Sequence, residues 1–324
     1  MNQKRIFLFI LCIIHGGVHG ILDPSGLRAY ASIGGLTFGT ASNIAHLRKN
    51  VNNGQFNQYV KKNYHLIESK NDLKPIKLWR GENHYDWVDS DWLLGATPQS
   101  TEWAQQNAME IRGHTLVWAN DKRIPTWLLQ QESSISPVKV KSLLSDYIHA
   151  VLGRYQGKIT SLDVINEAVD DAQNNTHPFK LRNCFWYRKD LMRLSFLFAH
   201  QADPQAQLYY NDYNIEWYGM KSNNVLQLLT WVRSQGATVH GVGVSTTVRP
   251  QDSYYQSAQR FIDNGFDIMI TEFDVSMLMN GSVPQDLNDL QKQASVYRAL
   301  VKYALHFYSK CRALTTWGFT DRYS

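Results

Sequence analysis

The 324-residue sequence contains only three cysteines, and Cys12 lies in an apolar run near the N-terminus. The other two, Cys184 and Cys311, are too few for a disulfide-stabilised scaffold, so a chain of this length must depend on a hydrophobic core. Apolar residues make up 44% of the sequence, which is enough for such a core. Composition leaves open whether the two cysteines pair with each other.

No apolar run approaches the ~20 residues that are needed to span a bilayer. Near the N-terminus, Lys4 and Arg5 precede nine apolar residues ending at Ile14. A short apolar run after a basic start is the pattern of a secretory signal peptide. We therefore predict a signal peptide over residues 1–20 and an exported, extracellular protein over residues 21–324, without a membrane anchor.

Special charge patterns and cofactor motifs are also lacking. The formal net charge is +5 without a long run of one sign, which gives no electrostatic footprint for nucleic acid. There is no His-Glu-x-x-His motif or Cys/His cluster, and "GVGV" at Gly241 lacks the third glycine of a dinucleotide fingerprint, because Thr246 stands there. We expect no metal, no cofactor and no nucleic-acid partner, and a monomer that binds a neutral or weakly acidic polymer.

The sequence also has no linker rich in proline, glycine or serine, which indicates a single domain. Strand-like apolar runs alternate with longer helical patterns, as in a (β/α)₈ TIM barrel of the α/β class. The chain stops at Ser324, soon after the last run, so we expect a barrel truncated before its eighth helix. The predicted strands are Leu36–Ala41, His65–Glu68, Ile111–Val117, Ile159–Asn166, Gln207–Asn211, Val239–Val244, Asp267–Thr271 and Ala313–Trp317, and helical patterns include Val138–Leu152, Cys184–Ala202, Val225–Ser234 and Gln285–Tyr308.

Two glutamates close strand-like runs about a hundred residues apart. Glu167 ends "ITSLDVINE" and Glu272 ends "FDIMITE". A parallel barrel keeps its chemistry at the carboxyl ends of its strands, and a pair of carboxylates is the usual requirement for breaking a glycosidic bond. The ten tryptophans offer flat apolar faces that suit pyranose rings. The sequence therefore indicates an enzyme that cleaves glycans.

Five motifs follow one another along the chain, namely "IRGHTLVW" from Ile111, "DVINEA" from Asp163, "LYYNDYNIE" from Leu208, "ITEFD" from Ile270 and "TTWGFTDRYS" from Thr315. In order and spacing they resemble the motifs of the glycoside hydrolase family 10 endo-β-1,4-xylanases, and the resemblance extends from about Phe38 to Ser324. It implies a secreted retaining enzyme that cleaves plant-wall xylan by double displacement, with Glu272 as nucleophile and Glu167 as acid/base, ~5 Å apart.

The same resemblance implies a set of substrate-binding residues. Asn166 matches the asparagine that holds the sugar 2-hydroxyl, and His114 and Trp118 match the floor of the cleavage subsite. The remaining matches are Trp317 as a stacking tryptophan, Tyr213 as an aromatic on the leaving-group side, and Asn71 and Lys74 as two positions of the second-strand pattern.

The sequence departs from the family pattern after the sixth strand. Ser245 and Thr247 stand where the family has a glutamine and a histidine, and that histidine normally hydrogen-bonds the nucleophile. A threonine hydroxyl has a shorter reach and cannot carry a positive charge. We therefore expect weakened activity.

Further substitutions surround the predicted subsites, namely Lys70, Pro75, Leu162, Ala119 and Asp121 in place of Glu, Trp, Trp, His and Gln. Two alternatives to a xylanase follow from these departures. The first is a catalytically impaired barrel that binds glycan without cutting it. The second is a β-1,4-glucanase, since Lys70 alters a subsite.

Overall fold

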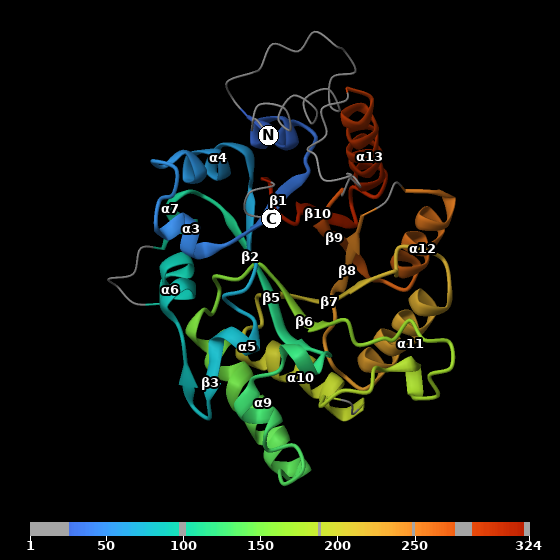
Figure 1. Ribbon diagram of the computed structural model, residues 1–324. Coiled ribbons are helices and arrows are strands. Elements are labelled where there is room, and N and C mark those ends of the chain that lie inside the picture. The colour runs from blue at the N-terminus through green and yellow to red at the C-terminus, as the bar shows by residue number, and fades with distance from the viewer. Residues whose placement is uncertain (1–25, 97–101, 187–188, 248–249, 276–286, 321–324) are drawn as a thin grey trace.

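The computed structural model describes residues 26–96, 102–186, 189–247, 250–275 and 287–320 (Figure 1). The predicted signal peptide, residues 1–20, lies outside these ranges. Within them, no helix combines the length and the apolar character that crossing a membrane requires.

Eight parallel strands form a closed barrel, which confirms the predicted fold (Figure 1). The first and last strands close it, with Phe38 opposite Leu314. Each predicted strand is present, with ends that differ by one or two residues. In their order around the barrel the strands are β1 (Thr37–Ser42), β10 (Cys311–Thr316), β9 (Asp267–Phe273), β8 (Gly241–Thr246), β7 (Gln207–Tyr213), β6 (Ser161–Asn166), β5 (Glu110–Trp118) and β2 (Leu66–Ser69).

Helices surround the barrel (Figure 1). The four predicted helical patterns correspond to α9, α10, α11 and α13. The start of α10 differs from the prediction, because Cys184 precedes the helix in a turn where the Phe185 N–H donates to Asp121. The helices are α2 (Leu27–Ile33), α3 (Ile44–Arg48), α4 (Gln55–Asn63), α5 (Pro75–Leu78), α6 (Val88–Leu94), α7 (Trp103–Gln106), α8 (Thr126–Leu129), α9 (Pro137–Arg154), α10 (Lys189–Ala202), α11 (Met220–Ser234), α12 (Asp252–Asp263) and α13 (Leu287–His306), with 3₁₀ turns η1 (Asp121–Arg123) and η2 (Pro178–Lys180).

The connection between β2 and β5 holds elements that the sequence pattern did not predict. It contains α5, α6, α7 and a small hairpin of β3 (Trp79–Gly81) and β4 (His84–Tyr85). Each piece is too short to display a helical or strand period. Local chemistry still explains one of them, because Pro75 occupies the first turn of α5, where its fixed φ favours the helix and its missing N–H costs nothing.

The interior of the barrel changes character along its axis. A small apolar cluster of Leu66, Tyr209, Met269 and Ala313 fills one level. The large apolar core comprises the outward faces of the strands and the helices packed on them. Charged residues occur inside the barrel beside the small cluster, and the Arg112 guanidinium lies 5.8 Å from the Tyr209 ring. The polar interior leads to the carboxyl ends of the strands.

Candidate active site

The two predicted catalytic glutamates lie on either side of Asn211, which belongs to β7. Glu167 directly follows β6, and its N–H donates to the Asn211 carbonyl at 2.8 Å. Glu272 belongs to β9, and its Oε1 accepts a hydrogen bond from Asn211 Nδ2 at 2.7 Å. The charge of Glu167 also acts on Glu272. The structure therefore brings the two residues together at one end of the barrel.

The backbone of Glu167 has an uncommon conformation. Its φ is +53°, in the left-handed region that non-glycine residues seldom adopt. The turn leaves the side chain half-buried, with Oε2 accepting a hydrogen bond from Trp118 Nε1 at 3.1 Å. Trp118 ends β5, so neighbouring strands supply the carboxylate and its donor. Backbone strain of this kind clusters at functional sites.

Glu272 is a half-buried carboxylate surrounded by charged groups. Burial has the largest influence on the pKa of Glu272 and raises it above its ordinary value. The charge of His114 and the bond from Asn211 oppose this rise, whereas Asp163 and Glu167 add to it. The charges of His114, Asp163 and Glu167 therefore help to set the pH at which Glu272 ionises.

Two tryptophans and a lysine surround the predicted floor residue. His114 is buried, with its ring centroid 5.8 Å from that of Trp118 and 5.5 Å from that of Trp317. Lys74 Nζ lies 4.9 Å and 5.3 Å from the same two tryptophan centroids. Asn71 joins this group through its Oδ1, which accepts from Lys74 Nζ at 3.3 Å. Five of the predicted binding residues therefore form one wall, namely His114, Trp118, Trp317, Lys74 and Asn71.

Asn166 presents an amide donor without a partner. Its Oδ1 accepts from Asn211 Nδ2 at 2.8 Å, and among the described residues its buried Nδ2 has no hydrogen-bond partner. Thr271 Oγ1 donates to Asn211 Oδ1 at 2.5 Å, which fixes the orientation of the amide that contacts Asn166. A buried donor with this geometry can serve a hydroxyl group of a ligand.

Tyr213, at the end of β7, lies on the Glu167 side of the site. Arg182 Nη2 donates to Tyr213 Oη at 2.6 Å, and Lys221 Nζ lies 3.7 Å from the centroid of its ring. Burial would lower the pKa of Arg182, but the hydrogen bond to Tyr213 and, less strongly, the charge of Glu167 raise it overall. Because Lys221 Nζ lies so close to the ring centroid, its ammonium covers one face of the Tyr213 ring.

Two of the substituted positions, Ser245 and Lys70, lie beside predicted site residues. Ser245 is the register partner of Glu272 between β8 and β9, while Thr247 is exposed. Lys70 Nζ lies 5.9 Å from the Trp317 centroid, and burial lowers the pKa of Lys70 although the charge of Asp274 opposes that effect. The substitutions thus change the charge and polarity beside the nucleophile position and the tryptophan wall.

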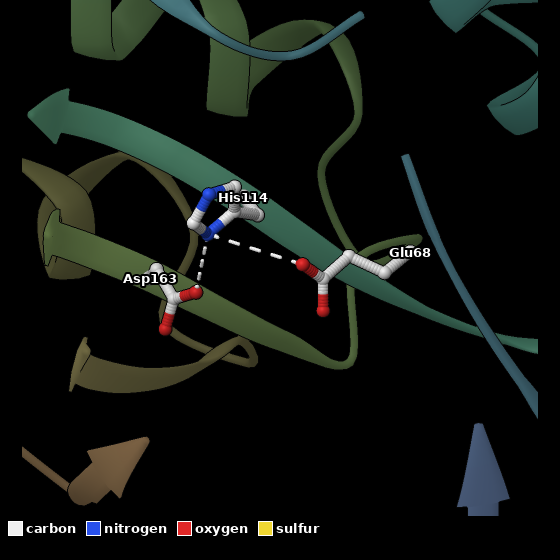
Figure 2. A group of neighbouring side chains, drawn as sticks. All are labelled: Glu68, His114 and Asp163. Carbon is white, nitrogen blue, oxygen red and sulfur yellow. Dashed lines mark hydrogen bonds and ion pairs between the residues drawn. The ribbon is translucent and has the colours of Figure 1, made fainter. Parts of the chain in front are cut away.

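Sequence reasoning missed a buried charge cluster beneath the wall, which we define as Glu68, Arg112, His114 and Asp163 (three of them in Figure 2). Their side chains are at most 1% exposed. His114 Nδ1 lies 2.9 Å from Asp163 Oδ2, Arg112 Nε lies 3.1 Å from Glu68 Oε2, and Arg112 also pairs with Asp163. The signal in the sequence that could have indicated this cluster is the presence of charged residues within otherwise apolar strand segments.

Three members of this cluster carry donor atoms that a metal can use. The ligand atoms of Glu68, His114 and Asp163 lie within 4.8 Å of one another. The guanidinium of Arg112, however, pairs with both carboxylates and already supplies the cation. The arrangement therefore fits an ion-pair cluster rather than a metal centre.

Comparison with known proteins shows that this chain is similar to xylanases in sequence and in fold. The family model described as glycosyl hydrolase family 10 matches residues 26–324. Endo-1,4-beta-xylanase B of Thermotoga neapolitana is 31% identical over 277 residues, which cover 83% of this chain and 74% of that protein. Beta-1,4-xylanase of Dictyoglomus thermophilum is 29% identical over 345 aligned positions, which cover 100% of this chain and 90% of that protein. The crystal structure of xylanase 10B from Thermotoga petrophila RKU-1 in complex with xylobiose has a TM-score of 0.82 at 26% identity. The match covers 94% of this chain and 89% of that chain.

Proposed function

Because the chain belongs to glycosyl hydrolase family 10, we propose that it is an endo-1,4-β-xylanase that retains anomeric configuration. The observation that carries this proposal is the placement of Glu167 and Glu272 on either side of Asn211 at one end of the barrel. Xylanases among its relatives, one of them crystallised with xylobiose, support xylan as the substrate.

The reaction proceeds in two displacements. In the first, a Glu272 oxygen attacks the anomeric carbon, the glycosidic C–O bond breaks, and Glu167 gives its proton to the leaving oxygen. In the second, Glu167 removes a proton from water, the water oxygen bonds to the anomeric carbon, and the bond to Glu272 breaks. Glu167 thereby returns to its protonated form and Glu272 to its carboxylate.

The surrounding residues bind and orient the sugar. The unpartnered Asn166 Nδ2 donates to the 2-hydroxyl of the sugar that is attacked. Trp118 and Trp317 provide apolar surface beside His114, while Lys74 and Asn71 offer polar contacts on the same wall. Tyr213 contacts the sugar on the leaving-group side.

We also infer that the protein is secreted after loss of residues 1–20. The basic start and short apolar run at the N-terminus support this inference. The intact mass of the protein recovered from the medium of a secreting host tests it. A mass that includes residues 1–20 would contradict the inference.

Reducing-sugar release tests the catalytic proposal. The parent should release reducing ends from xylan, Glu167→Gln should reduce kcat by about 10²–10⁴-fold, and Glu272→Ala should abolish turnover. Glu110→Gln is the control and should retain activity, because Glu110 begins β5 and so lies at the opposite end of the barrel from Trp118. Equal release by the parent and Glu272→Ala would refute the proposal.

The same assay decides between the proposal and its alternatives. A parent protein that binds xylan without releasing reducing ends is a glycan-binding barrel. The proximity of the Lys70 ammonium to Trp317 favours a shifted substrate preference as the second candidate. Faster hydrolysis of carboxymethylcellulose than of xylan would establish the β-1,4-glucanase.

A further inference from the structure

Glu68 is a fully buried carboxylate that receives no hydrogen bond from the described residues. Its Oε2 forms an ion pair with Arg112 Nε at 3.1 Å, and its Oε1 lies 3.9 Å from His114 Nδ1 (Figure 2). A buried carboxylate without hydrogen bonds is costly unless a nearby positive charge compensates it. The structure therefore requires an account of the charge that balances Glu68.

The charges within the cluster do not cancel while His114 is neutral. Glu68 and Asp163 carry two negative charges, and Arg112 carries one positive charge. Arg112 pairs with both carboxylates, so one negative charge remains. One further proton balances the cluster, and it can reside on Glu68 or on His114.

The hydrogen-bond geometry favours His114 as the carrier of that proton. The Nδ1–H of His114 donates to Asp163 Oδ2 at 2.9 Å and lies 3.9 Å from Glu68 Oε1. Two carboxylates therefore face the same ring nitrogen, and Figure 2 shows the other ring nitrogen directed away from both. Protonation of this second nitrogen turns the ring into a cation, and both carboxylates face the Nδ1 side of that cation.

The protonation tendencies of the two groups indicate that the cluster holds the additional proton, which the hydrogen-bond geometry assigns to His114. Burial raises the pKa of Glu68 to about 7, against the effects of Arg112 and His114. Burial alone would lower the pKa of His114, but the bond to Asp163 and the charges of Glu68, Glu272 and Asp163 raise it overall. The pair therefore retains a proton at higher pH than the separate groups in water, and their titrations are linked.

On the basis of the proposed function, we propose that Glu68 is a positioning residue that keeps His114 protonated, so that the imidazolium supplies positive charge to the ionised nucleophile Glu272. The charge of His114 acts on Glu272. Thr247, at the position of the family histidine, is exposed and cannot be charged. His114 on β5 thus provides the positive charge that Thr247, after β8, cannot carry.

Other charged groups also face this site and belong to the balance. Asp163 on β6, Glu272 on β9 and Glu68 on β2 oppose the cation Arg112, which shares β5 with His114. Lys74 lies against the tryptophan wall and interacts with Glu272, Glu68 and Glu167. A change at Glu68 therefore also acts on Lys74 and Glu272, so the titration of His114 itself has to be followed.

Glu68→Gln tests the proposal because it preserves the shape of the side chain and removes its charge. Nitrogen-15 NMR of labelled histidine follows the titration of His114 in the resting protein, with the signal assigned from the spectrum of His114→Asn. We expect the pKa of His114 to fall by about one unit or more in Glu68→Gln, since loss of a neighbouring opposite charge disfavours the cation. Glu68→Asp should restore most of the shift, and Glu110→Gln at the opposite end of the barrel should cause none.

The pH dependence of kcat/KM on xylan tests the second step. If the imidazolium supports the reaction, activity is lost as pH rises through the pKa of His114. The upper limb of the profile should therefore move to lower pH in Glu68→Gln by the same amount as the NMR titration. Glu68→Asp should return it toward the parent position, which a merely structural role would not do.

Each contrary outcome identifies the step that fails. An unchanged His114 titration in Glu68→Gln would mean that Glu68 is neutral in the protein, and would overturn the proposal. A shifted titration with an unmoved upper limb would overturn the role of the charge in the reaction. A parent protein without xylan hydrolysis would refute the proposed function, while the NMR titration would still decide whether Glu68 acts on His114.

Discussion

At the residue scale, Asn211 connects more of the site than either glutamate does. It contacts Glu167 through its carbonyl, and Glu272, Asn166 and Thr271 through its amide. The motif "LYYNDYNIE" contains Asn211, but one polar residue in a strand is not distinguishable there from its neighbours. Its role depends on contacts with β6 and β9, which only the folded barrel brings beside it.

Asn211→Asp should move the lower limb of the pH profile for xylan hydrolysis to higher pH. The change replaces the donor to Glu272 with a carboxylate, and both effects raise the pKa of Glu272 further above its ordinary value. Glu272 must be ionised to attack, so activity is lost as pH falls through that raised pKa. The measurement is kcat/KM from acidic to neutral pH, with exposed Asn264→Asp as the control. An unmoved lower limb would refute the role of Asn211.

At the scale of elements, the site depends on how closely neighbouring strands approach. Gly243, in the middle of β8, has no side chain where Asn211 of β7 and Thr271 of β9 approach it. A Cβ at this position would overlap Asn211 Oδ1 and lie 2.8 Å from Thr271 Cγ2. The glycine of "GVGV" therefore serves strand packing beside the nucleophile.

Gly243→Ala should reduce both stability and activity. Overpacking of this kind costs about 1–3 kcal/mol, and displacement of the Asn211 amide disturbs Glu272. The matched control is Gly153→Ala in α9, where an added Cβ meets no atom within 4 Å. That change should stabilise the helix by about 0.5–1 kcal/mol. Urea unfolding and xylan hydrolysis measure the pair, and equal stabilities would contradict the packing argument.

At the scale of the whole molecule, apolar burial rather than cross-linking holds the barrel together. Cys184 and Cys311 are buried and form no disulfide with each other, which answers the question that composition left open. Both belong to the large core, and burial raises the pKa of Cys311 to about 12. A thiol in this state is a poor nucleophile.

Reductant should therefore leave the Tm of the secreted protein unchanged. A thiol reagent should label Cys184 and Cys311 only after unfolding, because both side chains are buried and the Cys311 thiolate is disfavoured. Differential scanning calorimetry with and without dithiothreitol gives the first measurement, and absorbance of a coloured thiol reagent gives the second. A large fall in Tm on reduction would indicate a disulfide.

The barrel and the positions of its chemistry could be predicted from the sequence. Strand period, helical period and turn residues are properties of adjacent residues, so all eight strands were located within one or two residues of their ends. Glu167 and Glu272 were identifiable because each closes a strand, and parallel strands end at a common face. The ordered motifs added the family, which the match over residues 26–324 establishes.

Only the tertiary structure placed Glu68, Arg112 and Asp163 around His114, and Asn211 between the two glutamates. These contacts join residues tens of positions apart through the register of β2, β5, β6, β7 and β9. Burial and neighbouring charge, which set protonation, also exist only after the strands pair. Sequence thus determined which groups are available, because local patterns specify elements, whereas the folded barrel decided which groups interact.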